Sequence, residues 1–476
     1  MITATERLKA TTSYCESCRQ LVPARVEKRP GTDHDEIWMV KECATCGDSE
    51  SRLSSDARFY WLSQGSREDS AANCGSGCGC GPESWSPPPG LTRFQTPSAS
   101  GERIGFLGGN ALRALPAGNP IEVMSTCLAL IEIVHSCNLA CPTCFADSPP
   151  GVGSKVDAVP LAELKANITG VIQRKGRIEI LQLSGGEPTL HPDFFELVRW
   201  CQEHLEIDYV LVNSNGVRLA GDRAFGEQLR ECITYGKFQF YLQYDGPAVL
   251  ADELLRGADL RRMKEKAIVR AGELGIPLTL AMTVIPANLD QLWATVSFGL
   301  QYDHVRGVAF QPYFGSGRIP EAIRGGQKLN VADLITGLIA QSDDLVSADD
   351  FTPLPCGDPN CASIGYLLKI DGAVRSISDF VDFGTLQGFL SDRIRYRLED
   401  LIQCGCESEP LAELLHDLEM DESHTFRLFI KPFMDERDWD QDRIDRCCTH
   451  VIRPDGVLDS FCRYYLNGGA KPYVTA

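Results

Sequence analysis

Six apolar segments alternate with amphipathic segments between residues 119 and 316, and this alternation constrains the fold more than any other feature. The apolar segments are predicted strands at residues 128–134, 178–183, 209–215, 238–246, 277–285 and 305–314. The segments between them, such as LAELKANITGVIQR at 161–174, repeat apolar residues at helical spacing. Strands that are apolar at nearly every position are typical of a parallel sheet covered by helices. The chain is therefore predicted to form an α/β domain, either a doubly wound sheet or an incomplete (β/α) barrel.

The charge of the chain limits its partners. The 476 residues include 46 Lys and Arg against 65 Asp and Glu, which gives a net charge of −19. Such a surface repels phosphate backbones and anionic membranes, so we expect no nucleic-acid partner. The start, MITATERLKA, lacks the apolar core of a signal peptide, and no apolar run reaches 18 residues. We therefore expect a cytoplasmic protein that is not an integral membrane protein.

Twenty cysteines are the most unusual feature of the composition, and without an export signal they favour metal binding over disulfides. Cys15 and Cys18 form one C-x2-C pair, and Cys43 and Cys46 form a second pair. Each pair places two thiolates on one turn, and two such turns close a tetrahedral site for zinc or a single iron. Residues 1–66 are thus predicted to be a small domain of the rubredoxin-like or zinc-ribbon type. A closed four-cysteine site of this kind is expected to be structural.

Residues 67–118 have a different composition, rich in Gly, Ser and Pro, and this predicts a linker or insert. They also contain Cys74, Cys78 and Cys80. These three cysteines could wrap a metal cluster, or they could lie on an exposed arm.

Three more cysteines follow the first predicted strand in IEIVHSCNLACPTCFA, namely Cys137, Cys141 and Cys144. Ligands bind at the carboxyl ends of strands in parallel α/β sheets. Three thiolates on one tight loop can hold three corners of a [4Fe–4S] cube and leave the fourth iron open. The alternative is a closed zinc site, which needs a fourth ligand, and His135 is the nearest candidate.

This C-x3-C-x2-C loop, followed by Phe145, resembles the cluster loop of the radical S-adenosylmethionine (SAM) superfamily. The second predicted strand is followed by Ser184, Gly185, Gly186 and Glu187, which resemble the GGE motif of that superfamily. The resemblance implies a partial (β/α)6 TIM-like barrel at 119–316 and a cluster whose open iron chelates SAM. One electron from the cluster then cleaves SAM to methionine and a 5′-deoxyadenosyl radical, which takes hydrogen from a C–H bond. It also implies that Glu187 and the Gly-Gly backbone hold the SAM amino group.

Further polar residues follow later strands and are candidates for cofactor binding, although each could also belong to a capping turn. They are Asn213 and Asn215 after the third strand, Gln243 and Asp245 after the fourth, and Gln311 after the sixth.

The C-terminal third, with its adjacent cysteines in RCCTHVIRPDG, resembles a narrower subgroup that contains class D radical SAM methyltransferases and tetraether lipid synthases. This resemblance implies an auxiliary iron–sulfur region at 317–476 with one or two further [4Fe–4S] clusters. The implied ligands are Cys356, Cys361, Cys447, Cys448 and Cys462. Cys404 and Cys406 could supply two more ligands or lie exposed.

The subgroup implies two reactions that both form a C–C bond. Class D methyltransferases attach a one-carbon unit from a reduced folate-type donor to a heterocycle such as a pterin, whereas the lipid synthases join hydrocarbon chains. The acidic composition favours methylation of a small molecule, with an electron donor such as flavodoxin or ferredoxin. Lipid coupling is the alternative. A non-catalytic iron–sulfur electron carrier is a second alternative, which the intact three-cysteine loop and Glu187 disfavour.

Overall fold

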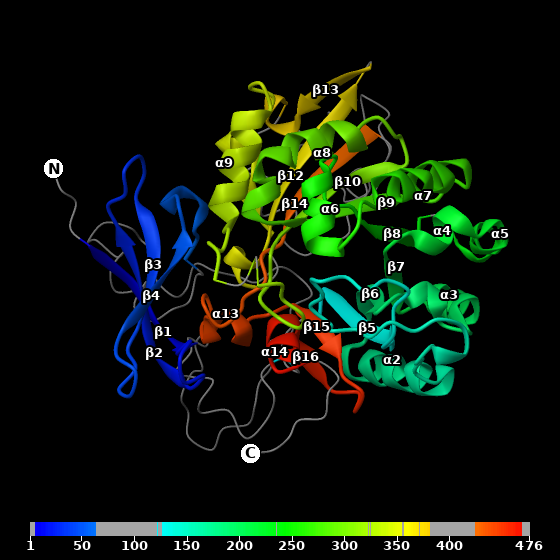
Figure 1. Ribbon diagram of the computed structural model, residues 1–476, viewed down its shortest axis with the longest axis horizontal. Helices are drawn as coiled ribbons and strands as arrows, with labels where there is room; N and C mark the ends of the chain where they lie inside the picture. Colours follow the sequence, from blue (N-terminus) through cyan, green and yellow to red (C-terminus); the bar gives the residue numbers. More distant parts are fainter. Residues whose placement is uncertain are drawn as a thin grey trace, which may run out of the picture.

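The protein is described by a computed structural model that covers residues 5–62, 126–234, 236–321, 325–354, 357–370, 372–380 and 424–468, together with residues 121 and 323. A small antiparallel sheet lies beside a large mixed sheet with its helices (Figure 1). The predicted linker at 67–118 lies outside the described residues, and so do Cys74, Cys78, Cys80, Cys356, Cys404 and Cys406.

The small sheet contains four strands in the order β1-β2-β3-β4. Their bounds are β1 Glu6–Tyr14, β2 Leu21–Arg29, β3 Glu36–Lys41 and β4 Ser49–Ser54. Alternate side chains on β2 and β3, among them Val26 and Met39, are fully buried between the sheet and its flanking loops. The sheet brings the two C-x2-C turns to the same end, because one turn follows β1 and the other follows β3.

The large sheet has a continuous row of parallel strands at its centre. They are β5 Leu128–Val134, β6 Ile178–Gly185, β7 Ile207–Ser214, β8 Phe238–Gln243, β9 Leu278–Val284 and β10 Val305–Pro312. Their order in the sheet follows their order in the chain, whereas a doubly wound sheet reverses its order at a switch point. The prediction of a partial barrel is therefore confirmed, and all six carboxyl ends face the same rim.

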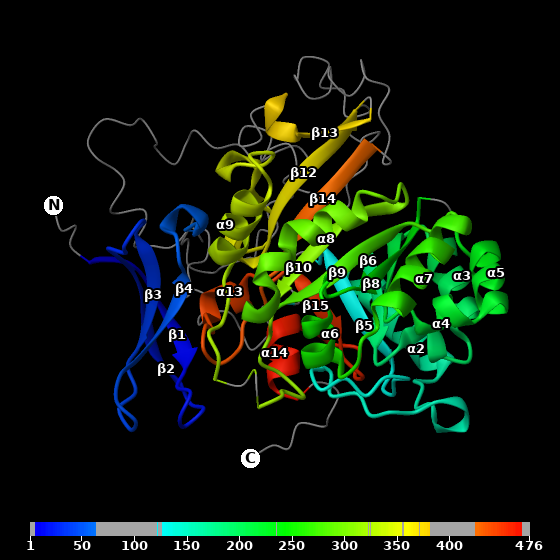
Figure 2. The ribbon, with the colours of Figure 1, turned by 45° about the horizontal axis from the view of Figure 1, so that its top comes forward.

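The helices between these strands pack their apolar faces onto one side of the sheet (Figure 2). They are α2 Leu161–Lys175, α3 Phe194–Glu203, α4 Val217–Gly221, α5 Arg223–Cys232, α6 Val249–Arg256, α7 Arg261–Glu273 and α8 Leu292–Gly299. α8 begins three residues later than the periodicity predicts, because Pro286–Gln291 forms a 3₁₀ helix first. Sequence periodicity missed α6, which is only two turns long.

The C-terminal residues extend both edges of this sheet, which the sequence did not predict. β14 Thr425–Ile430 pairs in parallel with β10, and β12 Ser363–Ile370 pairs antiparallel with β14. At the other edge β15 Thr449–Ile452 pairs in parallel with β5. Covering the edges satisfies backbone groups that a six-stranded open sheet would leave unpaired. The remaining elements are β11 Thr352–Pro353, β13 Ala373–Ser376, β16 Leu458–Ser460, α9 Val331–Gln341, α13 Gln441–Asp445 and α14 Phe461–Leu466.

The small sheet lies against α13, on the side of the molecule away from α2–α5 (Figure 1). None of the helices in the described ranges has the length and apolar character needed to cross a membrane.

Candidate active site and metal centres

Cys137, Cys141 and Cys144 lie on the loop that leaves β5, and all three line one cavity of ≈ 340 Å³ at the carboxyl rim of the sheet. Backbone hydrogen bonds fix this loop at both ends. The Cys137 N–H donates to the Pro149 carbonyl oxygen over 2.9 Å, and Cys144 exchanges two backbone bonds with Arg318 over 3.2 and 2.9 Å. The loop therefore presents its three thiols from a fixed backbone.

Two glycines let the end of β6 approach this loop. A Cβ at Gly185 would lie 2.1 Å from the Val134 carbonyl oxygen, and a Cβ at Gly186 would lie 2.1 Å from the Ser136 carbonyl oxygen. Gly185 also has a φ of 119°, which other residues rarely adopt. This close approach allows the Gly186 N–H to donate a hydrogen bond to the Val134 carbonyl oxygen over 2.7 Å.

Glu187 lies beneath the rim and not on the cavity wall. Its carboxylate is 1% exposed and accepts hydrogen bonds from the Thr189 hydroxyl (2.6 Å), the Ser214 hydroxyl (2.9 Å) and the Asn215 N–H (2.8 Å). Burial raises the pKa of this carboxyl, and the hydrogen bonds oppose that rise. In this arrangement Glu187 joins the GGE turn to the turn after β7.

Asn215 extends the same link to the cluster loop. Its side-chain amide donates to the Asn138 Oδ1 over 2.7 Å and lies 3.7 Å from the Cys137 Sγ, which also accepts from the Leu139 N–H at 3.4 Å. Donors directed at a thiolate sulfur are a feature of iron–sulfur sites. Burial raises the pKa of the Cys137 thiol to about 12, so deprotonation at neutral pH needs the compensating charge of bound metal.

The donor set fits a cube and not a single ion. In the described part of the chain, three or more candidate ligand atoms come within 4.8 Å of one another only at Cys15, Cys18, Cys43 and Cys46. His135 thus does not complete a zinc site with the three loop cysteines. Thiolates that bind different irons of a cube are farther apart than those of one tetrahedral ion.

The cavity brings together most of the remaining candidate residues. Phe145, Ser184, Asn213, Asn215, Gln243 and Gln311 all line it with the three cysteines. Asp245 does not, because it is buried in an ion pair with Arg256, whose Nε lies 2.6 Å from the Asp245 Oδ2.

Three basic residues near the rim were missed from the sequence, because nothing marks an isolated Arg or Lys. Arg256 lines the cavity from the end of α6. Lys264 is buried on α7 and donates to the Asn215 carbonyl oxygen over 2.7 Å; burial, with the nearby Arg256 charge, lowers its pKa to about 8. The Arg318 side chain donates to the carbonyl oxygens of Cys141 (3.2 Å) and Ser148 (2.8 Å), and so fixes the cluster loop from outside.

The four N-terminal cysteines form a compact site at one end of the small sheet. The Sγ atoms of Cys18 and Cys43 are 3.8 Å apart, as expected for two ligands of one tetrahedral zinc with metal–sulfur bonds of about 2.3 Å. The residue after each pair, Arg19 or Gly47, has a positive φ that closes the turn. A backbone N–H from Cys18 lowers the pKa of the Cys15 thiol to about 6, which favours the thiolate that a metal needs.

Four C-terminal cysteines gather behind the cavity. Cys447 is close enough to Cys361, Cys448 and Cys462 for their charges to interact, and Cys448 also lines the cavity of the cluster loop. The Sγ of Cys462 accepts from the Met434 N–H at 3.3 Å, and the Sγ of Cys361 accepts from Arg443 at 3.8 Å. These contacts are compatible with cluster ligands.

Comparison with known proteins gives two family matches. Residues 131–299 match the family described as the radical SAM superfamily, and residues 7–55 match the HMPTM N-terminal zinc ribbon domain. The first match includes the cluster loop, and the second includes all four N-terminal cysteines.

Individual relatives differ in how much of the chain they share. A 7,8-dihydro-6-hydroxymethylpterin dimethyltransferase of Methanocaldococcus jannaschii is 24% identical over 400 residues, which cover 72% of this chain and 78% of the relative. A PqqA peptide cyclase of Ruegeria pomeroyi is 33% identical over 180 residues, which cover 36% of this chain and 43% of the cyclase. The chain thus spans less than half of this second relative.

Among solved structures, Streptococcus suis SuiB bound to S-adenosylmethionine matches at 18% identity and a TM-score of 0.36, covering 46% of this chain and 49% of SuiB. That score is too low to support an argument about activity. The sequence matches, together with three cysteines on the loop after the first strand of a partial barrel, show that the chain is an enzyme that contains a radical SAM domain and an N-terminal zinc ribbon domain.

Proposed function

We propose that this enzyme methylates a carbon atom of a small heterocycle of the pterin type. The observation that carries the proposal is the row of amide side chains on the cavity wall beside the three loop cysteines. These amides are Gln182, Asn213, Gln239 and Gln311, from four different strands.

The amides are held in fixed orientations. The Tyr209 hydroxyl donates to the Gln239 Oε1 over 3.0 Å, and the Gln311 Nε2 donates to the Tyr241 hydroxyl over 3.2 Å. A side-chain amide offers both a donor and an acceptor, which matches the alternating donors and acceptors on the edge of a pterin ring. Arg427 adds a guanidinium to the same wall and can donate to a ring carbonyl.

The same wall disfavours coupling of lipid chains. These amides already hydrogen-bond to neighbouring side chains, and a pterin edge can use their remaining donor and acceptor capacity, whereas a hydrocarbon cannot. A volume of ≈ 340 Å³ is typical of a small-molecule site.

The chain's own residues define how the cofactors would be held. Cys137, Cys141 and Cys144 are the proposed ligands of a [4Fe–4S] cluster, and the Gly185–Gly186 backbone, Glu187 and Asn215 shape the adjacent SAM site. When bound, the cluster and SAM together supply a 5′-deoxyadenosyl radical able to remove hydrogen from a C–H bond. Phe145 and the walls of the cavity exclude water from that step.

The pterin dimethyltransferase relative supports this proposal, because it is similar over 72% of the chain and its substrate is a pterin. We further propose that a reduced folate-type donor supplies the carbon. The four proposed regions are a metal ribbon at 1–66, a linker at 67–118, the radical SAM core at 119–316 and an auxiliary-cluster region at 317–476.

An auxiliary [4Fe–4S] cluster at Cys361, Cys447, Cys448 and Cys462 would lie against the substrate cavity, because Cys448 is part of its wall. A cluster held by these four cysteines would supply an electron donor or acceptor beside the substrate. A flavodoxin or ferredoxin is the proposed external electron donor.

The test is to incubate the anaerobically reconstituted enzyme with SAM, dithionite, a methylene-folate donor and 6-hydroxymethyl-7,8-dihydropterin, and to measure product mass. The proposal predicts a pterin heavier by one or more methyl groups. Gln239→Leu should reduce this product while SAM cleavage continues, and the exposed Gln301→Leu serves as the matched control. An unchanged pterin in a reaction that still forms 5′-deoxyadenosine would contradict the proposal.

A further inference from the structure

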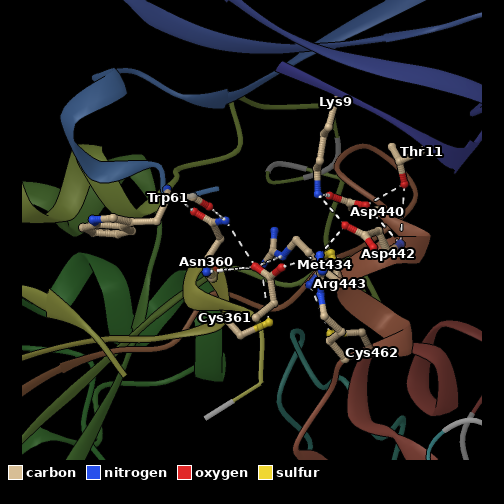
Figure 3. A network of polar contacts seen from close by, with 12 residues as sticks. Lys9, Thr11, Trp61, Asn360, Cys361, Met434, Asp440, Asp442, Arg443 and Cys462 are labelled. Carbon is tan, nitrogen blue, oxygen red and sulfur yellow. Dashed lines mark hydrogen bonds and ion pairs between the residues drawn. The ribbon is translucent and has the colours of Figure 1, made fainter. Parts of the chain in front are cut away.

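The N-terminal ribbon is joined to the C-terminal cysteine region by a buried ion-pair network (Figure 3). Lys9 on β1 is only 5% exposed, and its Nζ lies 2.6 Å from the Asp440 Oδ2 and 3.2 Å from the Asp442 Oδ2. The Thr11 hydroxyl donates to the other oxygen of Asp440 over 2.6 Å. Since Asp440 caps α13 and Asp442 lies in its first turn, β1 holds the start of that helix.

The same short helix directs a second cation at an auxiliary cysteine. Arg443 on α13 is buried, donates to the Asn360 carbonyl oxygen over 2.8 Å and lies 3.8 Å from the Cys361 Sγ. The Asn360 side chain returns to the ribbon, because its Nδ2 donates to the Trp61 carbonyl oxygen over 2.6 Å and its Oδ1 accepts from the Trp61 N–H over 2.9 Å. The cysteine is therefore connected to the ribbon along two separate paths.

An aromatic contact adds a third path. Tyr14, which directly precedes the metal-site residue Cys15, meets Trp439 edge to face with ring centroids 5.0 Å apart. Trp439 is buried in a cluster that also contains Met434 and Cys462. The start of the ribbon's first C-x2-C turn thus packs against the residues around Cys462, the second proposed cluster ligand reached from the ribbon.

The charges in this network balance. Lys9, Arg443 and Arg446 contact Asp358, Asp440 and Asp442, so three cations meet three carboxylates. Removing one partner from a buried ion pair leaves the other charge uncompensated, which disrupts the structure far more than loss of a surface pair. Lys9 is the only one of these six residues that the ribbon contributes, so the balance on α13 depends on the ribbon being docked.

We infer that the zinc ribbon is a positioning domain for the auxiliary cysteine site. Lys9 fixes α13 through Asp440 and Asp442, and α13 in turn holds Arg443 against Cys361 and leads directly into Cys447 and Cys448. Lys9 and Arg443 are positioning residues, which act through the cysteines and not on the substrate. This inference rests on the auxiliary cluster named under the proposed function.

The test compares Lys9→Met with Lys28→Met in the full-length, anaerobically reconstituted protein. Lys28 is a ribbon lysine on β2 whose side chain is 37% exposed and pairs with Glu6 on the neighbouring strand, so it is the matched control. Hydrogen–deuterium exchange in residues 441–462 should rise at least about tenfold in Lys9→Met and stay at the wild-type rate in Lys28→Met. The auxiliary-cluster signal in electron paramagnetic resonance should weaken in Lys9→Met alone, while both variants keep their ribbon metal.

Two further variants keep the inference falsifiable if Lys9→Met folds poorly. Thr11→Val removes one hydrogen bond to Asp440 and should produce a smaller change in the same residues. Lys9→Met/Asp440→Asn removes both charges and should recover part of the protection. Equal exchange in 441–462 for Lys9→Met, Thr11→Val and Lys28→Met would overturn the inference. A wild-type protein with no auxiliary iron would instead overturn the cluster assignment, whatever the exchange data show.

Discussion

Replacing Gly186 by alanine tests how the GGE turn serves the cluster loop. The new Cβ would lie 2.1 Å from the Ser136 carbonyl oxygen, whereas Cβ atoms stay at least 3.0 Å from such neighbours. The Ser136 oxygen belongs to the backbone and the Cβ is fixed to its own Cα, so neither atom can rotate away, and the two segments must separate by about 0.9 Å. Ser136 directly precedes Cys137, so this displacement falls on the first cluster-loop thiol.

A misplacement of about 1 Å in a catalytic site costs roughly 100-fold in rate. We therefore expect Gly186→Ala to cleave SAM about 100-fold more slowly than the wild type, measured as 5′-deoxyadenosine formed per chain under dithionite. Gly221→Ala is the matched control, because a Cβ there meets no atom within 4 Å. A Gly186→Ala rate within about twofold of the Gly221→Ala rate would refute the claim that close backbone approach positions the loop.

Three further predictions concern the buried charges and the ribbon metal. Asp245→Asn leaves the buried Arg256 charge without its partner and should lower the free energy of unfolding by about 3–5 kcal/mol in urea titrations. Asp259→Asn breaks an exposed pair with Arg261 and should change the free energy of unfolding by less than about 1 kcal/mol. Lys264 has a pKa of about 8 in the folded protein, below its unfolded value of 10.5. The unfolded chain therefore binds more protons between pH 8 and pH 10.5, and the contribution of Lys264 to stability rises with pH in this range. The difference in unfolding free energy between cluster-free wild type and Lys264→Met should therefore shift in favour of the wild type from pH 8 to 10.5, and parallel curves would contradict the assignment. Cys43→Ser should lose the ribbon metal in elemental analysis while Cys201→Ser, at a buried position on α3, retains it.

Local patterns were sufficient to predict the radical SAM core. β5 spans the predicted residues 128–134. A polar segment precedes this apolar run and the cysteine loop follows it, and these two boundaries determine where the strand begins and ends. The three cysteines and the GGE turn meet at one cavity because both follow adjacent parallel strands, which the alternation of elements already implies.

Long-range features were beyond sequence reasoning. β14 and β15 complete the sheet, yet each pairs with a strand more than 100 residues earlier, and nothing local names that partner. The burial of Glu187 under Asn215, and of Asp245 against Arg256, also depends on tertiary packing, so both carboxylates looked like open rim groups in the sequence. The same holds for Lys9, which in the sequence is an ordinary strand lysine and in the structure is the ribbon's buried link to α13.

The most direct test of the central claim is 5′-deoxyadenosine formation by the reconstituted, dithionite-reduced enzyme and by a variant with Cys137, Cys141 and Cys144 all replaced by alanine. We expect the wild type to release 5′-deoxyadenosine from SAM, and the triple variant to release none and still bind the ribbon metal. Equal release by both proteins, or none from a wild type that carries its full complement of iron, would contradict it.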